Sequence, residues 1–305
     1  MAAYDIGKRI RGVRESRNLK QEELAQGICS VGTLSKIENG IQIPKRKIFM
    51  ALMQRLGEPE YLYSIYLSQE EMQEMELCKQ MRQSIWKKEF EKAKELLEQY
   101  KFFLNENNIL EMQSYHMMSA FRHAKQKKNP YQVMLEFEKA LRVTRKEYPN
   151  GPPDKGEWLT FEEISILNSI AVQYYKIGES SKSFSYLKWL KEYLEQMHTS
   201  QEMVAKAYPF ILCNYAGMLC LKEKYEEAQL MALCGIRMCR EYAQFAALPY
   251  LLVAMARSLT LKGMAKEAEA CLEQAESLFC IMDCCGVLER LREHNRESFT
   301  LLMYM

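Results

Sequence analysis

The sequence predicts an all-α protein: a small N-terminal helical domain, then a right-handed α-solenoid of about five helical hairpins. Three observations support this. The N-terminal part contains two short amphipathic helices separated by a tight corner. The rest of the chain repeats one pattern of small and apolar residues five times. The 13 glycines and 8 prolines are few outside positions that end helices, which leaves long segments able to be helical.

The tight corner near the N-terminus has recognisable turn chemistry. The first short helix ends at Gly27, where the missing Cβ permits a left-handed turn. Ser30 then stands where a side-chain oxygen can accept a backbone N–H of the second helix. That helix covers residues 31–39, with Leu34 and Ile37 on one side. The arrangement is that of a helix-turn-helix, whose second helix fits the major groove of DNA.

Charge is distributed unevenly along the chain. Residues 1–67 hold eleven Lys and Arg against seven Asp and Glu, whereas the remainder holds thirty-one against thirty-three. Phosphate neutralisation provides most non-specific DNA affinity, so this asymmetry favours a DNA-contacting domain on a neutral body. Residues 45–47 form one basic cluster. The predicted first helix carries a basic face made of Lys8, Arg9, Arg11, Arg14 and Arg17.

The segment GKRIRGVRESRNLKQEELAQGI, with TLSKIENG and a following proline, resembles the Xre/Cro-type helix-turn-helix family across residues 5–57. The resemblance implies that Gln21 contacts a phosphate and that the N-terminal part of the second helix faces the groove. The sequence departs from the family at Lys20, where Ser or Thr is usual, and at Val31 and Gly32, where polar side chains are common. The expected DNA contacts are Arg9, Gln21, Ser30, Val31, Gly32, Thr33, Ser35, Lys36 and Lys45.

We expect a DNA-binding domain over residues 1–57, a connector over 58–69 and a repeat domain over 70–305. The repeats have small or apolar residues at i, i+4 and i+7, and their starts are separated by 40, 50, 45 and 40 residues. This resembles the second helix of a tetratricopeptide repeat (TPR), in a degenerate form longer than the usual ~34 residues. A terminal helix over 286–305 is expected to cover the last repeat. The five copies are Ala93/Leu97/Tyr100, Val133/Phe137/Ala140, Ser183/Leu187/Leu190, Ala228/Ala232/Gly235 and Ala268/Leu272/Ala275.

Stacked hairpins form a concave surface lined by their first helices, which suits an extended peptide. Asparagine and glutamine amides can satisfy a peptide's backbone N–H and C=O groups. Asn168 and Asn214 stand at nearly equivalent places, fifteen and fourteen residues before their repeat motifs. The alternative is that each caps or bridges neighbouring helices. Helical position adds Arg122, Gln173 and Tyr175 to the expected lining.

The segment ICSVGTLSKIENGIQIP, followed by helical hairpins, is similar to the PlcR/PrgX/Rgg group of peptide-sensing transcription regulators. The resemblance implies a short signalling peptide held by the two asparagines. It also implies that Lys79 meets the peptide's terminal carboxylate and that Tyr63 and Tyr250 contribute contacts. A solvated helix surface is the alternative for Lys79. We expect a homodimer on a palindromic operator, with the peptide acting on the heads through residues 57–69.

Two other functions remain open. In one, the repeat array of a helix-turn-helix regulator binds a protein partner instead of a peptide. In the other, the chain is a phosphatase-modulating scaffold that does not bind DNA. No nucleophile, phosphate-loop or zinc-protease motif occurs, so we expect neither enzyme activity nor a cofactor.

The ten cysteines form no CxxC pair, and most occupy apolar helical positions. This favours reduced, packed thiols. The alternative is a metal or redox site at Cys280, Cys284, Cys285 and His294, although that spacing matches no common zinc pattern. With no membrane segment and no signal-peptide core, the sequence predicts a cytoplasmic protein without metal or membrane contacts.

Overall fold

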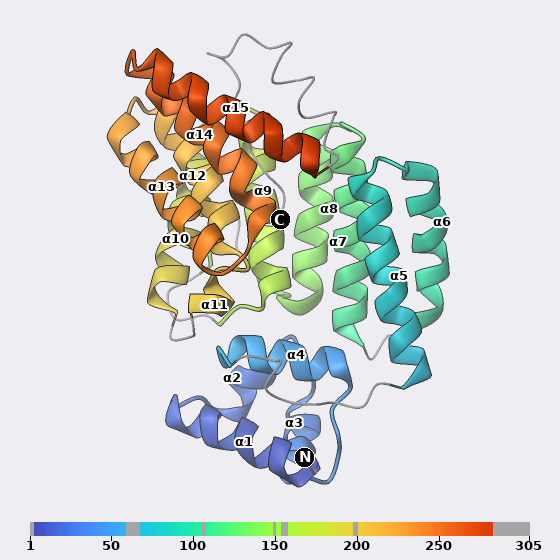
Figure 1. The fold of residues 1–305 in the computed structure, drawn as a ribbon. Helices are drawn as coiled ribbons and strands as arrows, with labels where there is room; N and C mark the ends of the chain where they lie inside the picture. Colours follow the sequence, from blue (N-terminus) through green and yellow to red (C-terminus); the bar gives the residue numbers. More distant parts are fainter. Residues whose placement is uncertain are drawn as a thin grey trace. The chain divides into compact units, whose positions relative to one another are not determined.

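The computed structural model describes residues 3–58, 68–104, 108–148, 151–153, 158–197 and 201–282, and every regular element in these ranges is a helix (Figure 1). The predicted all-α class, with a helix-turn-helix followed by TPR-like hairpins, is confirmed. The chain divides into two compact units, residues 1–177 with 198–200, and residues 178–197 with 201–305. Most of the expected connector, residues 59–67, and the expected terminal helix at 286–305 lie outside the described residues.

Four helices form the head, residues 3–58: α1 (Ala3–Ser16), α2 (Gln21–Ala25), α3 (Val31–Glu38) and α4 (Arg46–Arg55). Apolar residues three and four apart meet in one core, in which Leu24 and Leu34 are fully buried. Gly27, with φ of 68°, turns the chain between α2 and α3. The Thr33 backbone N–H donates to Ser30 Oγ at 3.0 Å, so the predicted cap of α3 is confirmed.

The rest of the first unit contains α5 (Gln69–Trp86), α6 (Phe90–Tyr100), the 3-10 helix η2 (Lys101–Phe103), α7 (Ile109–Lys125), α8 (Pro130–Thr144) and α9 (Phe161–Lys176). Helix α5 packs against α6, α7 against α8, and α8 against α9. Capping boxes of Ser68 with Glu71 and of Thr160 with Glu163 begin α5 and α9, and Asn129 caps α8. Within this unit, α4 is the head helix nearest α7 and α8 (Figure 1).

The second unit contains α10 (Ser180–Gln196), α11 (Gln201–Val204), α12 (Tyr208–Leu221), α13 (Tyr225–Glu241), the 3-10 helix η3 (Phe245–Ala247), α14 (Leu248–Leu261) and α15 (Ala265–Ile281). Helices α12 with α13 and α14 with α15 form hairpins, and α13 also packs against α14. A Cβ added at Gly235 in α13 would lie 2.6 Å from Leu251 Cδ2 in α14. The small residue therefore stands where two helices approach closely.

The predicted repeat motif falls on α6, α8, α10, α13 and α15, one copy on each helix. Every residue of the five copies is buried except Leu272, which is half-buried. The third predicted hairpin is divided, because α9 belongs to the first unit and α10 to the second. Among the described helices, none combines the length and apolar character needed to cross a membrane.

Candidate nucleic-acid interface

The outer face of α3 is small and polar apart from one valine. Val31, Gly32 and Lys36 are exposed, whereas Thr33 and Ser35 are half-buried beside them. A Cβ added at Gly32 would have only Ser30 Oγ within 4 Å, at 3.9 Å, so this face has room for another molecule. A helix of this kind, with its first turn unobstructed, can approach base edges in a major groove.

The N-terminus of α3 is arranged by its capping residue. Ser30 is exposed, and its Oγ lies 2.8 Å from Thr33 Oγ1 as well as accepting the Thr33 N–H. At the start of α2, Lys20 provides no side-chain cap; instead its backbone N–H donates to Glu23 Oε2 at 2.6 Å. Glu23 thus accepts the backbone N–H of the N-cap residue, which is the half of a capping box that does not need the hydroxyl of the family pattern at Lys20.

Inside the head, α1, α2 and α3 are joined by a buried polar network. Arg14 Nε and Nη2 donate to the two carboxylate oxygens of Glu38 at 2.6 and 3.0 Å, and Arg14 Nη1 donates to the Leu19 carbonyl at 2.8 Å. Gln21 Nε2 donates to the same carboxylate at 2.7 Å. The expectation that Arg14 belongs to an outward basic face is therefore wrong, because its charge is buried on Glu38.

Other basic residues of α1 are engaged by carboxylates. Arg9 Nη2 lies 2.8 Å from Glu58 Oε2, although more than half of the Arg9 side chain is exposed. Arg11 Nε lies 2.8 Å from Glu15 Oε1, and the bond to Glu15 raises the pKa of Arg11. These ion pairs are at the surface and therefore weak, so a DNA phosphate can compete for the same guanidinium groups.

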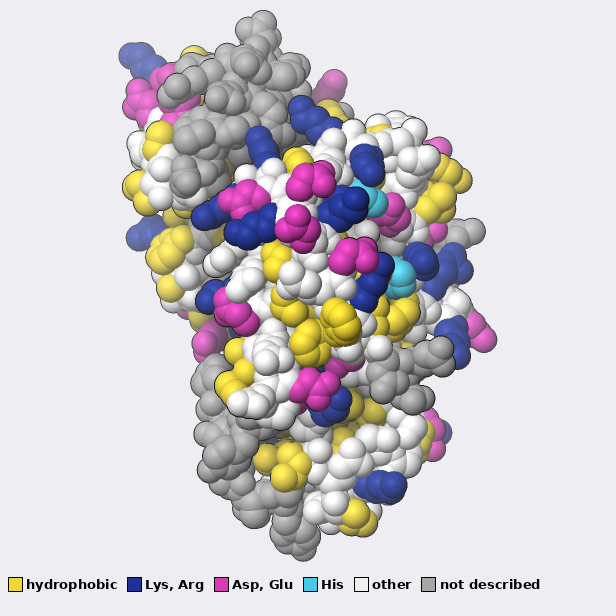
Figure 2. Space-filling view, turned by 90° about the vertical axis from the view of Figure 1, so that its right-hand side faces the viewer, with side chains coloured by type: hydrophobic (Ala, Val, Ile, Leu, Met, Phe, Trp, Pro, Cys, Tyr) yellow, Lys and Arg dark blue, Asp and Glu magenta, His cyan; other side chains and the backbone are white. Residues whose placement is uncertain are grey.

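The three residues of the basic cluster at 45–47 have different surroundings: one is exposed to solvent and the other two contact helix α5. Lys45 is exposed. The Arg46 backbone N–H donates to Glu71 Oε1 at 2.7 Å, and Lys47 Nζ lies 2.8 Å from Glu74 Oε1. Lys45 is thus the exposed member of the cluster, whereas Arg46 and Lys47 are half-buried. The face seen in Figure 2 likewise has basic and acidic side chains interspersed, without a continuous basic patch among its described residues.

The expected peptide contacts lie mostly inside the helical layers. Asn168 on α9 and Asn214 on α12 are both 0% exposed, and Gln173 and Tyr250 are also buried. Tyr175 is half-buried. Asn168 belongs to the first unit and Asn214 to the second.

The two predicted basic peptide contacts have acceptors within the chain. Arg122 Nη2 lies 2.7 Å from His123 Nε2, and the other ring nitrogen of His123 lies 2.7 Å from Glu136. Lys79 is 63% exposed and 3.6 Å from Glu76 across one helical turn. Tyr63 lies outside the described residues.

The described cysteines form no disulfide, and no described group of three His, Cys, Asp or Glu could hold a metal ion. Burial raises the pKa of the Cys29 thiol, beside α3, to about 11, which disfavours the reactive thiolate. Cys280 is exposed, and its proposed companions Cys284, Cys285 and His294 lie outside the described residues.

Sequence reasoning missed Glu38 and Glu163. The position of Glu38, four residues after Leu34 and therefore on the inner side of α3, was a usable signal, because a carboxylate there requires a buried partner. For Glu163, the Thr160-x-x-Glu163 spacing indicated a helix cap. No local pattern indicated its arginine partners, one of which is Arg55 in the head.

Residues 10–62 match the family described as Helix-turn-helix. Among solved structures, Bacillus thuringiensis PlcR in complex with the peptide PapR7 and DNA has a TM-score of 0.59 at 20% identity, over 94% of this chain and 99% of that one. The apo form of the same PlcR has a TM-score of 0.55 at 18% identity, over 95% and 98%. No curated protein matches the sequence significantly. The head is an Xre-type helix-turn-helix domain, and the whole chain resembles PlcR in fold.

Proposed function

We propose that this chain, with its Xre-type helix-turn-helix and PlcR-like fold, is a DNA-binding transcription regulator controlled by a short peptide. The observation that carries the proposal is the exposed face of α3, with Val31, Gly32 and Lys36 outward and Ser30 at its capped start. PlcR has been solved with a peptide and DNA together, which supports assigning both ligands to a chain of this fold.

In this proposal the DNA contacts are divided by role. Val31, Gly32 and Lys36 read base edges, with Thr33 and Ser35 flanking them. Lys45 and Ser30 contact phosphates, and Arg9 does so by exchanging Glu58 for a phosphate. Gln21 keeps one amide N–H on Glu38 and has a second for a phosphate oxygen. Two heads on one operator require a homodimer with two-fold symmetry.

The test of DNA binding begins with sites selected from a random DNA pool by the wild-type chain. Lys36→Ala should lose about 1–3 kcal/mol of discrimination at one base position, measured by fluorescence anisotropy. Lys45→Ala should weaken binding to all sequences and reduce the salt slope by about 0.9 for each head, which is about 1.8 for the dimer on its operator. The matched control is Lys188→Ala, an exposed lysine paired with Glu192 in the second unit. Recovery of no preferred site would contradict the proposal.

The peptide contacts in this proposal remain Asn168 and Asn214, which the fold buries among helices. Because both are buried, a peptide must displace the groups now covering them, so we expect association well below the diffusion limit. Calorimetry with short synthetic peptides encoded beside the gene tests this. Saturable binding lost in Asn168→Ala and Asn214→Ala supports the proposal. DNA binding without a response to any such peptide would favour the rival in which the repeats bind a protein.

A further inference from the structure

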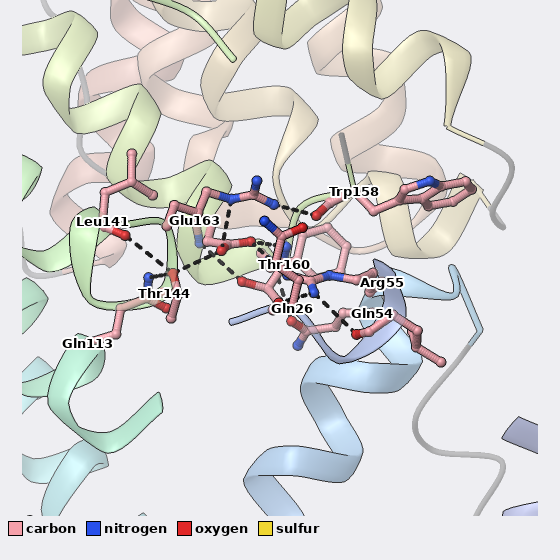
Figure 3. A network of polar contacts seen from close by, with 12 residues as sticks. Gln26, Gln54, Arg55, Gln113, Leu141, Thr144, Trp158, Thr160 and Glu163 are labelled. Carbon is pink, nitrogen blue, oxygen red and sulfur yellow. Dashed lines mark hydrogen bonds and ion pairs between the residues drawn. The ribbon is translucent and has the colours of Figure 1, made fainter. Parts of the chain in front are cut away.

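Arg55, the last residue of α4, connects the head to the repeat helices through a buried guanidinium group (Figure 3). Its Nη1 donates to the carbonyl oxygens of Leu24, at 3.2 Å, and of Gln26, at the end of α2. Its Nη2 lies 3.4 Å from Glu163 Oε2 in the first turn of α9. One side chain therefore joins two head helices to a helix 108 residues further along the chain.

Glu163 is as deeply buried as Arg55, and both of its carboxylate oxygens accept hydrogen bonds. It accepts from Arg145 Nε at 3.0 Å, Thr144 Oγ1 at 2.9 Å and the Thr160 backbone N–H at 2.8 Å. Burial raises the pKa of Glu163, but Arg55 and Arg145 with these hydrogen bonds lower it below the ordinary value. The carboxylate is consequently ionised and shared between an arginine of the head and one of the body.

Three further contacts join the head to residues 144–161: a close backbone approach, a hydrogen bond and an apolar contact. A Cβ added at Gly27, between α2 and α3, would lie 2.4 Å from the Thr144 carbonyl oxygen. Gln54 Oε1 accepts the Phe161 N–H at 3.2 Å, and Trp158 packs on the head core. Rotation of the head against α8 and α9 would break these contacts and leave buried charges without their partners, which is strongly unfavourable.

Helix α9 also carries three of the expected peptide groups, Asn168, Gln173 and Tyr175, beyond Glu163 on the same helix. We propose that Arg55 and Glu163 fix the orientation of the head against α8 and α9, and that a displacement of α9 at Asn168 reaches the DNA-binding helix through this junction. The coupling part of this inference rests on the proposed function. It is a route between the repeats and the head in addition to the expected one through residues 57–69.

The first experiment measures how much the DNA affinity falls when the distance between the two half-sites of the operator is increased. The wild-type chain, with its heads held fixed, should bind its selected operator about a hundredfold more tightly than versions with two or four base pairs inserted between half-sites. Glu163→Gln and Arg55→Met should reduce that ratio to below about tenfold while leaving base preference within each half-site unchanged. Arg55→Lys, which keeps the charge but not the fork of donors, should give an intermediate ratio.

These variants suit the question because Gln at position 163 can still cap α9, as Glu and Gln both do at that position. The matched control is Glu227→Gln, which removes an exposed carboxylate paired with Lys224 at 2.8 Å and should leave the spacing ratio unchanged. An unchanged ratio in both Glu163→Gln and Arg55→Met, with the variants folded, overturns the proposal.

The second experiment needs neither DNA nor peptide, so it separates failure of this inference from failure of the proposed function. Hydrogen exchange in the full-length chain should show residues 46–55 and 161–176 loosening together in Glu163→Gln and in Arg55→Met, with little further change in the double variant. Asn168→Ala should also accelerate exchange in residues 46–55, and this effect should disappear in the Glu163→Gln background. If exchange were faster in only one of the two helices, α4 or α9, in every variant, the proposal that Arg55 and Glu163 couple them would be wrong.

Discussion

The guanidinium group of Arg14 and the carboxylate of Glu38 form a two-point ion pair in the interior of the head, at 2.6 and 3.0 Å. The Arg14 side chain is only 10% exposed and that of Glu38 only 1%. This pair ties α1 to the helix that presents the candidate DNA contacts. Arg14 is therefore a structural residue of the head and not a phosphate ligand.

Removal of one member of this pair should destabilise the head. Glu38→Gln or Arg14→Met leaves a buried group without its charged partner, at a cost of about 3–5 kcal/mol. Hydrogen exchange of α1 and α3 in the full-length chain measures the loss. Arg11→Met, which breaks the exposed pair with Glu15, is the control and should leave the opening free energy close to that of the wild-type chain. Equal effects of the two arginine variants would contradict the structural role of Arg14.

Gly27→Ala should lower the thermal stability of the chain more than Gly263→Ala does, although both glycines have a positive φ. Gly27 has φ of 68°, and its added Cβ would lie 2.4 Å from the Thr144 carbonyl oxygen. Gly263, with φ of 79° and nothing within 4 Å, is the matched control because it isolates the backbone strain. Gly263→Ala should lose about 1 kcal/mol and Gly27→Ala at least about 2 kcal/mol, judged by thermal unfolding. Similar losses would show that the contact with Thr144 relaxes easily.

Gly235→Val should test the close approach of α13 and α14. The nearest atoms to an added Cβ are the Leu251 methyl groups, at 2.6 and 2.9 Å, so the larger side chain must displace them. We expect a loss of about 1–3 kcal/mol by thermal unfolding. Gly12→Ala in α1 is a contrasting substitution, because nothing lies within 4 Å of it. There the gain in helix propensity should stabilise the chain by about 0.5–1 kcal/mol.

The raised pKa of Glu111 predicts that the stability of the folded chain depends on pH. Burial and then the neighbouring carboxylate Glu74 raise the pKa of Glu111 to about 7 from an ordinary value of 4.5. Between these values the folded chain holds a proton that the unfolded chain has released, so this group's contribution to stability falls as pH rises. Glu111→Gln should remove that dependence and unfold at a higher temperature than wild type at pH 8, with a smaller difference at pH 5. A difference that is constant with pH would contradict the shift.

Much of the fold follows from local sequence. Ser30 before an apolar i, i+3 pair is sufficient to begin α3, and the repeated small residues from Ala93 to Ala275 predict the packed helices of each hairpin. These features depend on neighbours within one or two helical turns, for which sequence spacing specifies which side chains meet. The exposed positions of Val31, Gly32 and Lys36 follow from the same periodicity.

The tertiary structure alone decided which charges are available for binding. Composition placed a basic excess in the head, but folding directs Arg14 to Glu38 and Arg55 to Glu163, pairs separated by 24 and 108 residues. It likewise buries Asn168 and Asn214, which sequence spacing could mark only as equivalent. Helical periodicity identifies the face on which a side chain lies. The partner it meets depends on which distant helix packs there, because the ion pairs of a buried junction form only when the whole chain has folded.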